Sequence, residues 1–277
     1  MATTEEAEAF LRDFHAAHPA VTARAMAHGR AEDGRSSYAL LRDRMAACER
    51  VLDLGCGDGL LLELLAESRR GRPGREVAGL DLSVAELALA RRRPGLERAA
   101  LCAGRAQQLP FRSAQFDGCV SHMALMLMGE VERVADEVAR VLAPGGTLAV
   151  AVSGGAAGGE AYECFQRAAR SLIGAAPEEQ QIPRLGDRRL RTREGLDEVF
   201  GPAGFGPVEW KTERIDLTGP WEQVWATVGG CYDLGPLAPA LAAELRARVE
   251  AEARELTRPD GRIPCAMLMH VATTVRR

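Results

Sequence analysis

Hydrophobic and polar positions follow two alternating patterns over the first 150 residues. Short apolar runs with the length of buried strands lie at 50–54, 77–81, 99–103, 116–121 and 147–152. Apolar residues recur at helical spacing between these runs, which predicts helices near 58–67, 84–92 and 130–142. Regular alternation of strand and helix predicts an α/β fold, with a parallel sheet covered by helices on both faces.

The rest of the chain adds helices and two further strands. Helices are expected at 5–15 and 37–48, ahead of the first strand. The glycine-rich run 153–159 is expected to be flexible and to lead into a helix over 160–173. The remaining predicted elements are a helix at 191–200, a strand at 207–217, helices at 219–229 and 236–257, and a strand at 264–275.

A glycine-rich loop follows the first predicted strand. The sequence V-L-D-L-G-C-G-D-G (51–59) places three glycines between the strand and a predicted helix. Glycine accepts positive φ angles and has no Cβ atom, so a ligand can approach the main chain there. The dinucleotide-binding fingerprint G-x-G-x-x-G would need a third glycine where Leu60 stands, which disfavours a nicotinamide-dependent oxidoreductase but leaves it as an alternative.

Several further segments continue this pattern. Asp81 ends the second predicted strand, L-P-F (109–111) precedes F-D-G-C-V (116–120), and V-A-R-V-L-A-P-G-G-T-L (138–148) joins a helix to a strand. Together with the glycine loop, these segments resemble the class I S-adenosylmethionine-dependent methyltransferases over residues 50 to 152. A-G-F (203–205) resembles a later turn of the same family.

The resemblance implies a Rossmann-like, doubly wound α/β fold. Its sheet has seven strands, and the last strand inserts antiparallel beside the sixth. Residues 46–277 would form this core, with residues 1–45 as an N-terminal helical lid. Helical cap insertions are expected at about 154–190 and 218–262, where they would build the wall of a substrate pocket.

The resemblance also implies S-adenosylmethionine as the cofactor. Asp53 would bind its amino group, the Gly55, Cys56 and Gly57 loop would admit its methionine portion, and Asp81 would hold the ribose diol. The remaining residues expected at the cofactor are Leu82 on the adenine face, Ser121 at the end of the fourth strand, and Tyr38, which would close over the ligand.

The loop after the third strand departs from the family pattern. The family often has G-D-A here, whereas this chain has Gly104, Arg105 and Ala106. An aspartate accepts the adenine amino hydrogens, and an arginine has no acceptor atom. Adenine recognition must therefore rely on the Ala106 backbone N–H, on Gln107 or on an unexpected acceptor, with Arg105 nearby.

The fourth strand ends in S-H-M-A (121–124), without the [DN]-P-P-[YF] loop of enzymes that methylate DNA adenine or protein glutamine. A small-molecule acceptor, methylated on oxygen, nitrogen or an electron-rich carbon and belonging to secondary metabolism, is therefore expected. His122 is the candidate general base, its alternative being a structural histidine at the strand end. The candidate acceptor-binding residues are His15, His18, Met123 and Met126; methionines at such spacing more often belong to a plain core.

Composition and charge exclude further classes of partner, metal site and location. The formal net charge is −4 without a clustered basic excess, so no nucleic-acid partner is expected. Seven cysteines without a C-x-x-C pair argue against zinc and disulfides, and no metal site is expected. The chain shows neither an apolar leader nor a membrane-length run, which favours a cytoplasmic protein without membrane contact. A noncatalytic cofactor-binding protein of the same fold stays open, as does the oligomeric state.

Overall fold

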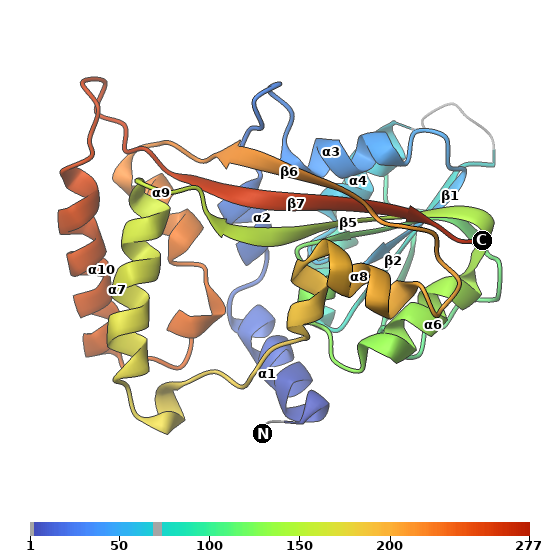
Figure 1. Cartoon of the computed structure of the whole chain (residues 1–277), viewed down its shortest axis with the longest axis horizontal. Helices are drawn as coiled ribbons and strands as arrows, with labels where there is room; N and C mark the ends of the chain where they lie inside the picture. Colours follow the sequence, from blue (N-terminus) through green and yellow to red (C-terminus); the bar gives the residue numbers. More distant parts are fainter. Residues whose placement is uncertain (1–2, 69–73) are drawn as a thin grey trace.

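The computed structural model describes residues 3–68 and 74–277, and a seven-stranded sheet forms its centre (Figure 1). The strands follow the order β3-β2-β1-β4-β5-β7-β6. Neighbours from β3 to β5 pair in parallel, and β7 runs antiparallel to both β5 and β6. The strands are β1 Arg50–Leu54, β2 Glu76–Asp81, β3 Ala100–Ala103, β4 Phe116–His122, β5 Leu142–Ala156, β6 Glu209–Asp216 and β7 Ala266–Val275. The predicted fold class, including its antiparallel last strand, is confirmed.

Helices surround this sheet. The α-helices are α1 Thr4–Ala17, α2 Val21–Met26, α3 Ser37–Arg44, α4 Leu60–Glu67, α5 Val84–Ala90, α6 Val131–Val141, α7 Ala161–Gly174, α8 Arg193–Phe200, α9 Trp221–Val228 and α10 Pro239–Arg254. The short 3₁₀ turns are η1 Leu125–Leu127, η2 Glu178–Gln180, η3 Arg188–Arg191 and η4 Tyr232–Leu234. Contacts join α7 to α10, α2 to α9, and α1 to α5.

Alternate residues of β1 serve opposite faces of the sheet, as the period of a strand requires. Val51 belongs to the apolar cluster that includes α3 and α4, whereas Leu52 and Leu54 belong to the cluster that includes α6 and α8. All three side chains are fully buried. With both faces covered, the carboxyl ends of the parallel strands are left as the place where a ligand can bind.

Three expectations differ from the structure. Strand β5 continues to Ala156 instead of becoming flexible at 153, because it pairs with Met267 and Leu268 of β7 across a bulge near Gly155. Helix α3 ends at Arg44, several residues earlier than expected. Helix α2 was not expected; its N-cap, Ala20, has φ 58° and makes no side-chain capping bond, so the sequence carries no helix-start signal there.

Candidate active site

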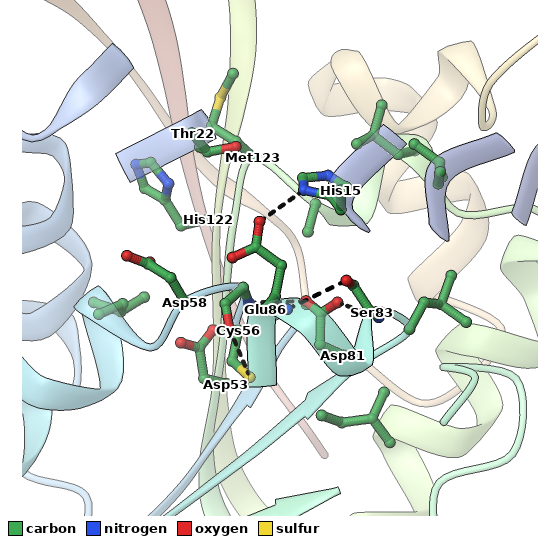
Figure 2. Close-up of a pocket in the computed structure, with 18 of the residues that line it drawn as sticks. His15, Thr22, Asp53, Cys56, Asp58, Asp81, Ser83, Glu86, His122 and Met123 are labelled. Carbon is green, nitrogen blue, oxygen red and sulfur yellow. Dashed lines mark hydrogen bonds and ion pairs between the residues drawn. The ribbon is translucent and has the colours of Figure 1, made fainter. Parts of the chain in front are cut away.

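A cavity opens at the carboxyl ends of β1, β2 and β4 (Figure 2). The strand ends and the loops that follow them form one side, and residues of α1, α2, α3 and η4 complete the wall. Its empty volume is about 1010 Å³, which includes space open to solvent. Small-molecule sites usually enclose about 300–1,000 Å³, so the cavity has room for a cofactor together with an acceptor.

The loop after β1 needs its glycines. Gly55 and Gly57 have φ angles of 76° and 52°, which other residues rarely adopt. A Cβ atom on Gly55 would lie 2.3 Å from the Cβ of Ala124, whereas a Cβ on Gly57 would meet no protein atom within 4 Å. The loop is therefore packed tightly at Gly55 and open at Gly57. Cys56, between them, also lines the cavity.

Asp53 brings an unsatisfied carboxylate to the cavity. The residue is 1% exposed, and neither carboxylate oxygen has a hydrogen-bond partner among the described residues. Burial raises the pKa of Asp53 well above its usual range, and the charges of Asp81 and Asp58 raise it further. A buried carboxylate without partners calls for a ligand that donates hydrogen bonds or carries positive charge. The amino group of S-adenosylmethionine meets that requirement.

Asp81 joins the loops that follow β1 and β2. Its carboxylate accepts hydrogen bonds from the backbone N–H groups of Gly57 and Ser83, each at 2.8 Å. Burial raises the pKa of Asp81, and these two hydrogen bonds oppose the rise. Leu82 lies next to it in the cavity lining. The Asp81 side chain therefore holds the loop after β1 against the loop after β2. Its carboxylate oxygens still have lone pairs that can accept hydrogen bonds from ligand hydroxyls.

The loop after β3 reaches the cavity through Ala106 and Gln107, but not through Arg105. The Gln107 amide donates to the Gly129 carbonyl at 2.8 Å and to Glu8 at 3.3 Å. Arg105 pairs instead with Glu8 at 2.7 Å. Glu8 comes from α1 and lines the cavity, so α1 brings a carboxylate to the loop that lacks one.

His122 lines the cavity from the end of β4 and is held on two sides. Its ring stacks on Tyr38 with 4.0 Å between the ring centroids, and its Nε2 lies 2.9 Å from the Ser37 hydroxyl. Burial lowers the pKa of His122 to about 3. The imidazole is therefore neutral at physiological pH, and such a weak base is poorly matched to proton abstraction at neutral pH. Burial also raises the pKa of Tyr38, which keeps its phenol protonated.

The remaining predicted site residues divide into two groups. His15 and Met123 line the cavity, whereas His18, Ser121 and Met126 do not. The Ser121 hydroxyl donates to the Leu54 carbonyl at 2.8 Å and accepts the backbone N–H of Leu125 at 3.1 Å, so it supports the β4 end. Met126 accepts the Ser153 N–H at 3.3 Å, and the ring of His18 packs on Phe14 with centroids 4.9 Å apart.

Glu86 and Tyr232, which the motifs do not point to, join the site through His15. His15 Nδ1 lies 2.9 Å from Glu86 Oε1, and Nε2 lies 3.0 Å from the Tyr232 hydroxyl. The backbone N–H of Ala20 donates to the same Glu86 oxygen at 2.9 Å. Glu86 thus connects α5 to the end of α1, the start of α2 and η4. Further polar lining residues outside the motifs include Glu8, Thr22 and Ser83.

The low pKa of His122 predicts a specific loss of stability in acid. The unfolded imidazole takes up a proton below about pH 6.5, whereas the folded one stays neutral down to about pH 3, so stability falls as pH falls through this window. When the pH is lowered from 7 to 5, the free energy of unfolding should decrease by about 2 kcal/mol more in the wild type than in His122→Gln. Urea unfolding of both proteins at both pH values measures the difference, and equal losses would show that the imidazole titrates freely.

Comparisons with known proteins agree with this geometry. The model of the family "Methyltransferase domain" matches residues 52–150. Trans-aconitate 2-methyltransferase of Methylobacterium nodulans is 31% identical over 252 residues, which cover 86% of this chain and 91% of that enzyme. Demethylmenaquinone methyltransferase of Thermus thermophilus is 40% identical over 107 residues, or 38% of this chain and 47% of the relative. The chain spans under half the length of the first curated relatives it matches.

Solved structures share the fold at low identity. The [4+2]-cyclase SpnF superposes with a TM-score of 0.56 and 20% identity, over 96% of this chain and 93% of that chain. The extended similarity to a methyltransferase, the family match and the cavity together identify the class. The chain belongs to the S-adenosylmethionine-dependent methyltransferases of the Rossmann-like fold, and S-adenosylmethionine is the cofactor of this family.

The described residues contain neither a metal-binding cluster nor a helix that could span a membrane. Within residues 3–68 and 74–277, no three His, Cys, Asp or Glu side chains are grouped so as to hold a metal ion. In the same part of the chain, no helix combines the length and the apolar character that crossing a bilayer requires.

Proposed function

We propose that the chain transfers a methyl group from S-adenosylmethionine to a small-molecule acceptor without the help of a metal ion. The observation that carries this proposal is the grouping of the unpartnered Asp53, the open Gly57 and the loop-joining Asp81 in one cavity. Bound there, the cofactor supplies a methyl group activated by positively charged sulfur. The protein's main contribution is to hold the acceptor in line with that methyl group and to exclude water.

Each part of the cavity has a proposed role. Asp53 would hold the amino group of the cofactor, the Gly55 to Gly57 loop its methionine portion, and Asp81 its ribose. Glu8, together with Gln107, would supply the acceptor atoms for adenine that Arg105 cannot, and Tyr38 would cover the ligand. Each role rests on the position of the residue in the cavity lining or, for Arg105, on its ion pair with Glu8.

His122 is proposed to face the acceptor. Its stacking on Tyr38 and its contact with Ser37 favour a positioning role, since a pKa near 3 makes it a weak general base. Segments 1–45, 154–190 and 218–262 are proposed to form the lid and cap. Side chains from the first and last of these segments, such as Leu11 and Tyr232, line the cavity and support that proposal.

The acceptor is proposed to be a secondary metabolite with an apolar or aromatic body, handled in the cytoplasm. Apolar side chains such as Leu11, Ala23 and Met123 support such a body. Seven cysteines, five of them buried, fit a reducing compartment. By their names, two relatives act on a demethylmenaquinone and on trans-aconitate, so the comparisons leave the acceptor open.

Calorimetry and a transfer assay test the function. The protein should bind S-adenosylmethionine and S-adenosylhomocysteine and should not bind NADPH. With methyl-labelled S-adenosylmethionine and a panel of small metabolites, mass spectrometry should find a product that has gained one methyl group, formed equally well with EDTA present. Binding of NADPH alone would support the oxidoreductase alternative, cofactor binding without any product would favour a noncatalytic protein, and loss of activity in EDTA restored by Mg²⁺ would refute metal independence.

A further inference from the structure

The polar lining of the cavity is acidic. Five carboxylates line it, namely those of Glu8, Asp53, Asp58, Asp81 and Glu86, and no Lys or Arg side chain of the described residues does so. A carboxylate ligand is normally held by Arg or Lys, because these side chains donate charge-assisted hydrogen bonds. An anionic acceptor would therefore meet repulsion in this cavity, and no Lys or Arg of the described lining would compensate for it.

Most of these carboxylates already have partners. Glu8 pairs with Arg105 at 2.7 Å, Asp58 pairs with Arg93, and Asp81 accepts two backbone N–H groups. Asp53 and Glu86 differ, because each keeps at least one buried oxygen without a hydrogen-bond partner among the described residues. The cofactor's amino group accounts for Asp53 under the proposed function, which leaves Glu86 to be explained.

Glu86 lines the cavity, and its Oε2 is buried without a hydrogen-bond partner among the described residues. The residue is 2% exposed, and His15 and Ala20 both contact Oε1, so the carboxylate cannot turn away without breaking these contacts. In Figure 2 the carboxylate stands above Cys56 with Oε1 joined to His15, while Oε2, which has no partner, points away from His15. Leaving such an oxygen buried and unpaired is unfavourable, and a cationic or N–H-bearing ligand removes the penalty.

We infer that the methyl acceptor is an amine whose nitrogen is received beside Glu86, and that carboxylate acceptors are excluded. This inference rests on the proposed function and gives it a substrate class. The lone pair of the neutral nitrogen forms the new N–C bond as the C–S bond breaks, and the electron pair of the C–S bond stays on sulfur. The positive charge thus moves from sulfur to nitrogen, and the ammonium product later loses a proton to water if it carries one.

The charge balance favours nitrogen over acidic oxygen acceptors. Methylation of a neutral amine keeps one positive charge in the cavity, so fixed carboxylates neutralise it before and after transfer. A phenolate or carboxylate acceptor would bring a further negative charge next to Glu86. The acidic lining disfavours such acceptors, because like charges at short range repel strongly where water is excluded.

Two analogues of the cofactor test the inference without knowledge of the acceptor. Sinefungin carries an amine where S-adenosylmethionine carries the reacting methyl group, and S-adenosylhomocysteine is uncharged there. The amino-acid, ribose and adenine groups are the same in both, so the contacts of Asp53 and Asp81 cancel in the ratio of affinities. Calorimetry should show that wild type prefers sinefungin and that Glu86→Gln lowers this preference about ten- to hundredfold.

The control is Glu213→Gln on β6, a carboxylate that pairs with Lys211 and lies outside the cavity lining. It should leave the ratio unchanged. An unchanged ratio in Glu86→Gln, with S-adenosylhomocysteine still bound, would overturn this inference alone, whereas failure of the wild type to bind either analogue would overturn the proposed function. If Glu86→Gln does not fold, the wild type alone tests the inference. Equal affinity of the wild type for both analogues, or methylation of trans-aconitate by it, would contradict an amine site.

Discussion

Replacing Asp81 by Asn should weaken the binding of S-adenosylmethionine about ten- to hundredfold. The carboxylate accepts the N–H groups of Gly57 and Ser83, and both oxygens are engaged in holding the loop. An amide keeps one acceptor oxygen and turns an NH₂ group toward the other N–H, so the loop loses a contact at the point where the ribose is expected. Titration calorimetry with S-adenosylmethionine measures the loss.

Asp117→Asn is the matched control for this experiment. Asp117 also accepts backbone N–H groups, those of Glu49 and Arg50 at 2.8 Å each, but it lies at the opposite end of β4 from the cavity. The same substitution there should lower stability and leave cofactor affinity unchanged. Equal affinity of wild type and Asp81→Asn would remove Asp81 from the cofactor site, and an equal loss in both variants would indicate a general effect on the fold.

The parts of the fold that repeat could be predicted from the sequence. Each parallel strand is a short apolar run followed by a helix with an apolar stripe, and these signals are local. The glycine loop and Asp81 follow directly from their strands, so their meeting in one cavity is a consequence of parallel pairing between β1 and β2. The antiparallel last strand came from the family resemblance and not from periodicity.

The carboxylates of α1 and α5 that line the cavity could not be placed from the sequence in the same way. Glu8 lies among Ala7 and Leu11 on the buried side of α1, and Glu86 lies beside Leu87 on the buried side of α5. An acid on an apolar stripe is a signal that could have marked both residues, because such a group needs a partner when it is buried. Their partners, Arg105 and His15, are 97 and 71 residues away, and only the tertiary structure brings them together.

His122 shows a second property that the sequence alone could not predict. Its place at the strand end follows from the sequence, but its proton affinity depends on burial and on the Tyr38 ring that covers it. Tyr38 belongs to α3, which packs against β4 through contacts that no motif encodes. A residue type suited to acid–base chemistry is therefore insufficient evidence for a catalytic base until its surroundings are known.

Gly55→Ala should cost the fold roughly 2–5 kcal/mol, a large part of the stability of a typical domain. The φ angle of 76° is unfavourable for alanine, and the new Cβ would lie 2.3 Å from the Cβ of Ala124, so the loop or the segment after β4 must move. Chemical denaturation without ligand measures this loss. Gly145→Ala is the control for backbone strain, since its φ is 79° and no atom lies within 4 Å of the new Cβ; it should cost only about 1–2 kcal/mol.

Gly57→Ala separates folding from cofactor binding in the same loop. Its φ of 52° is within reach of alanine, and its Cβ would meet no protein atom within 4 Å, so its stability should resemble that of Gly145→Ala. Because that open space is where the methionine portion of the cofactor is proposed to lie, its affinity for S-adenosylhomocysteine should fall at least about tenfold, as a methyl group displaces the ligand from the main chain. If Gly57→Ala bound S-adenosylhomocysteine as tightly as the wild type, the cofactor would have to lie elsewhere in the cavity. If Gly55→Ala were as stable as the wild type, the loop would have to accommodate a Cβ atom at Gly55 despite the short distance to Ala124.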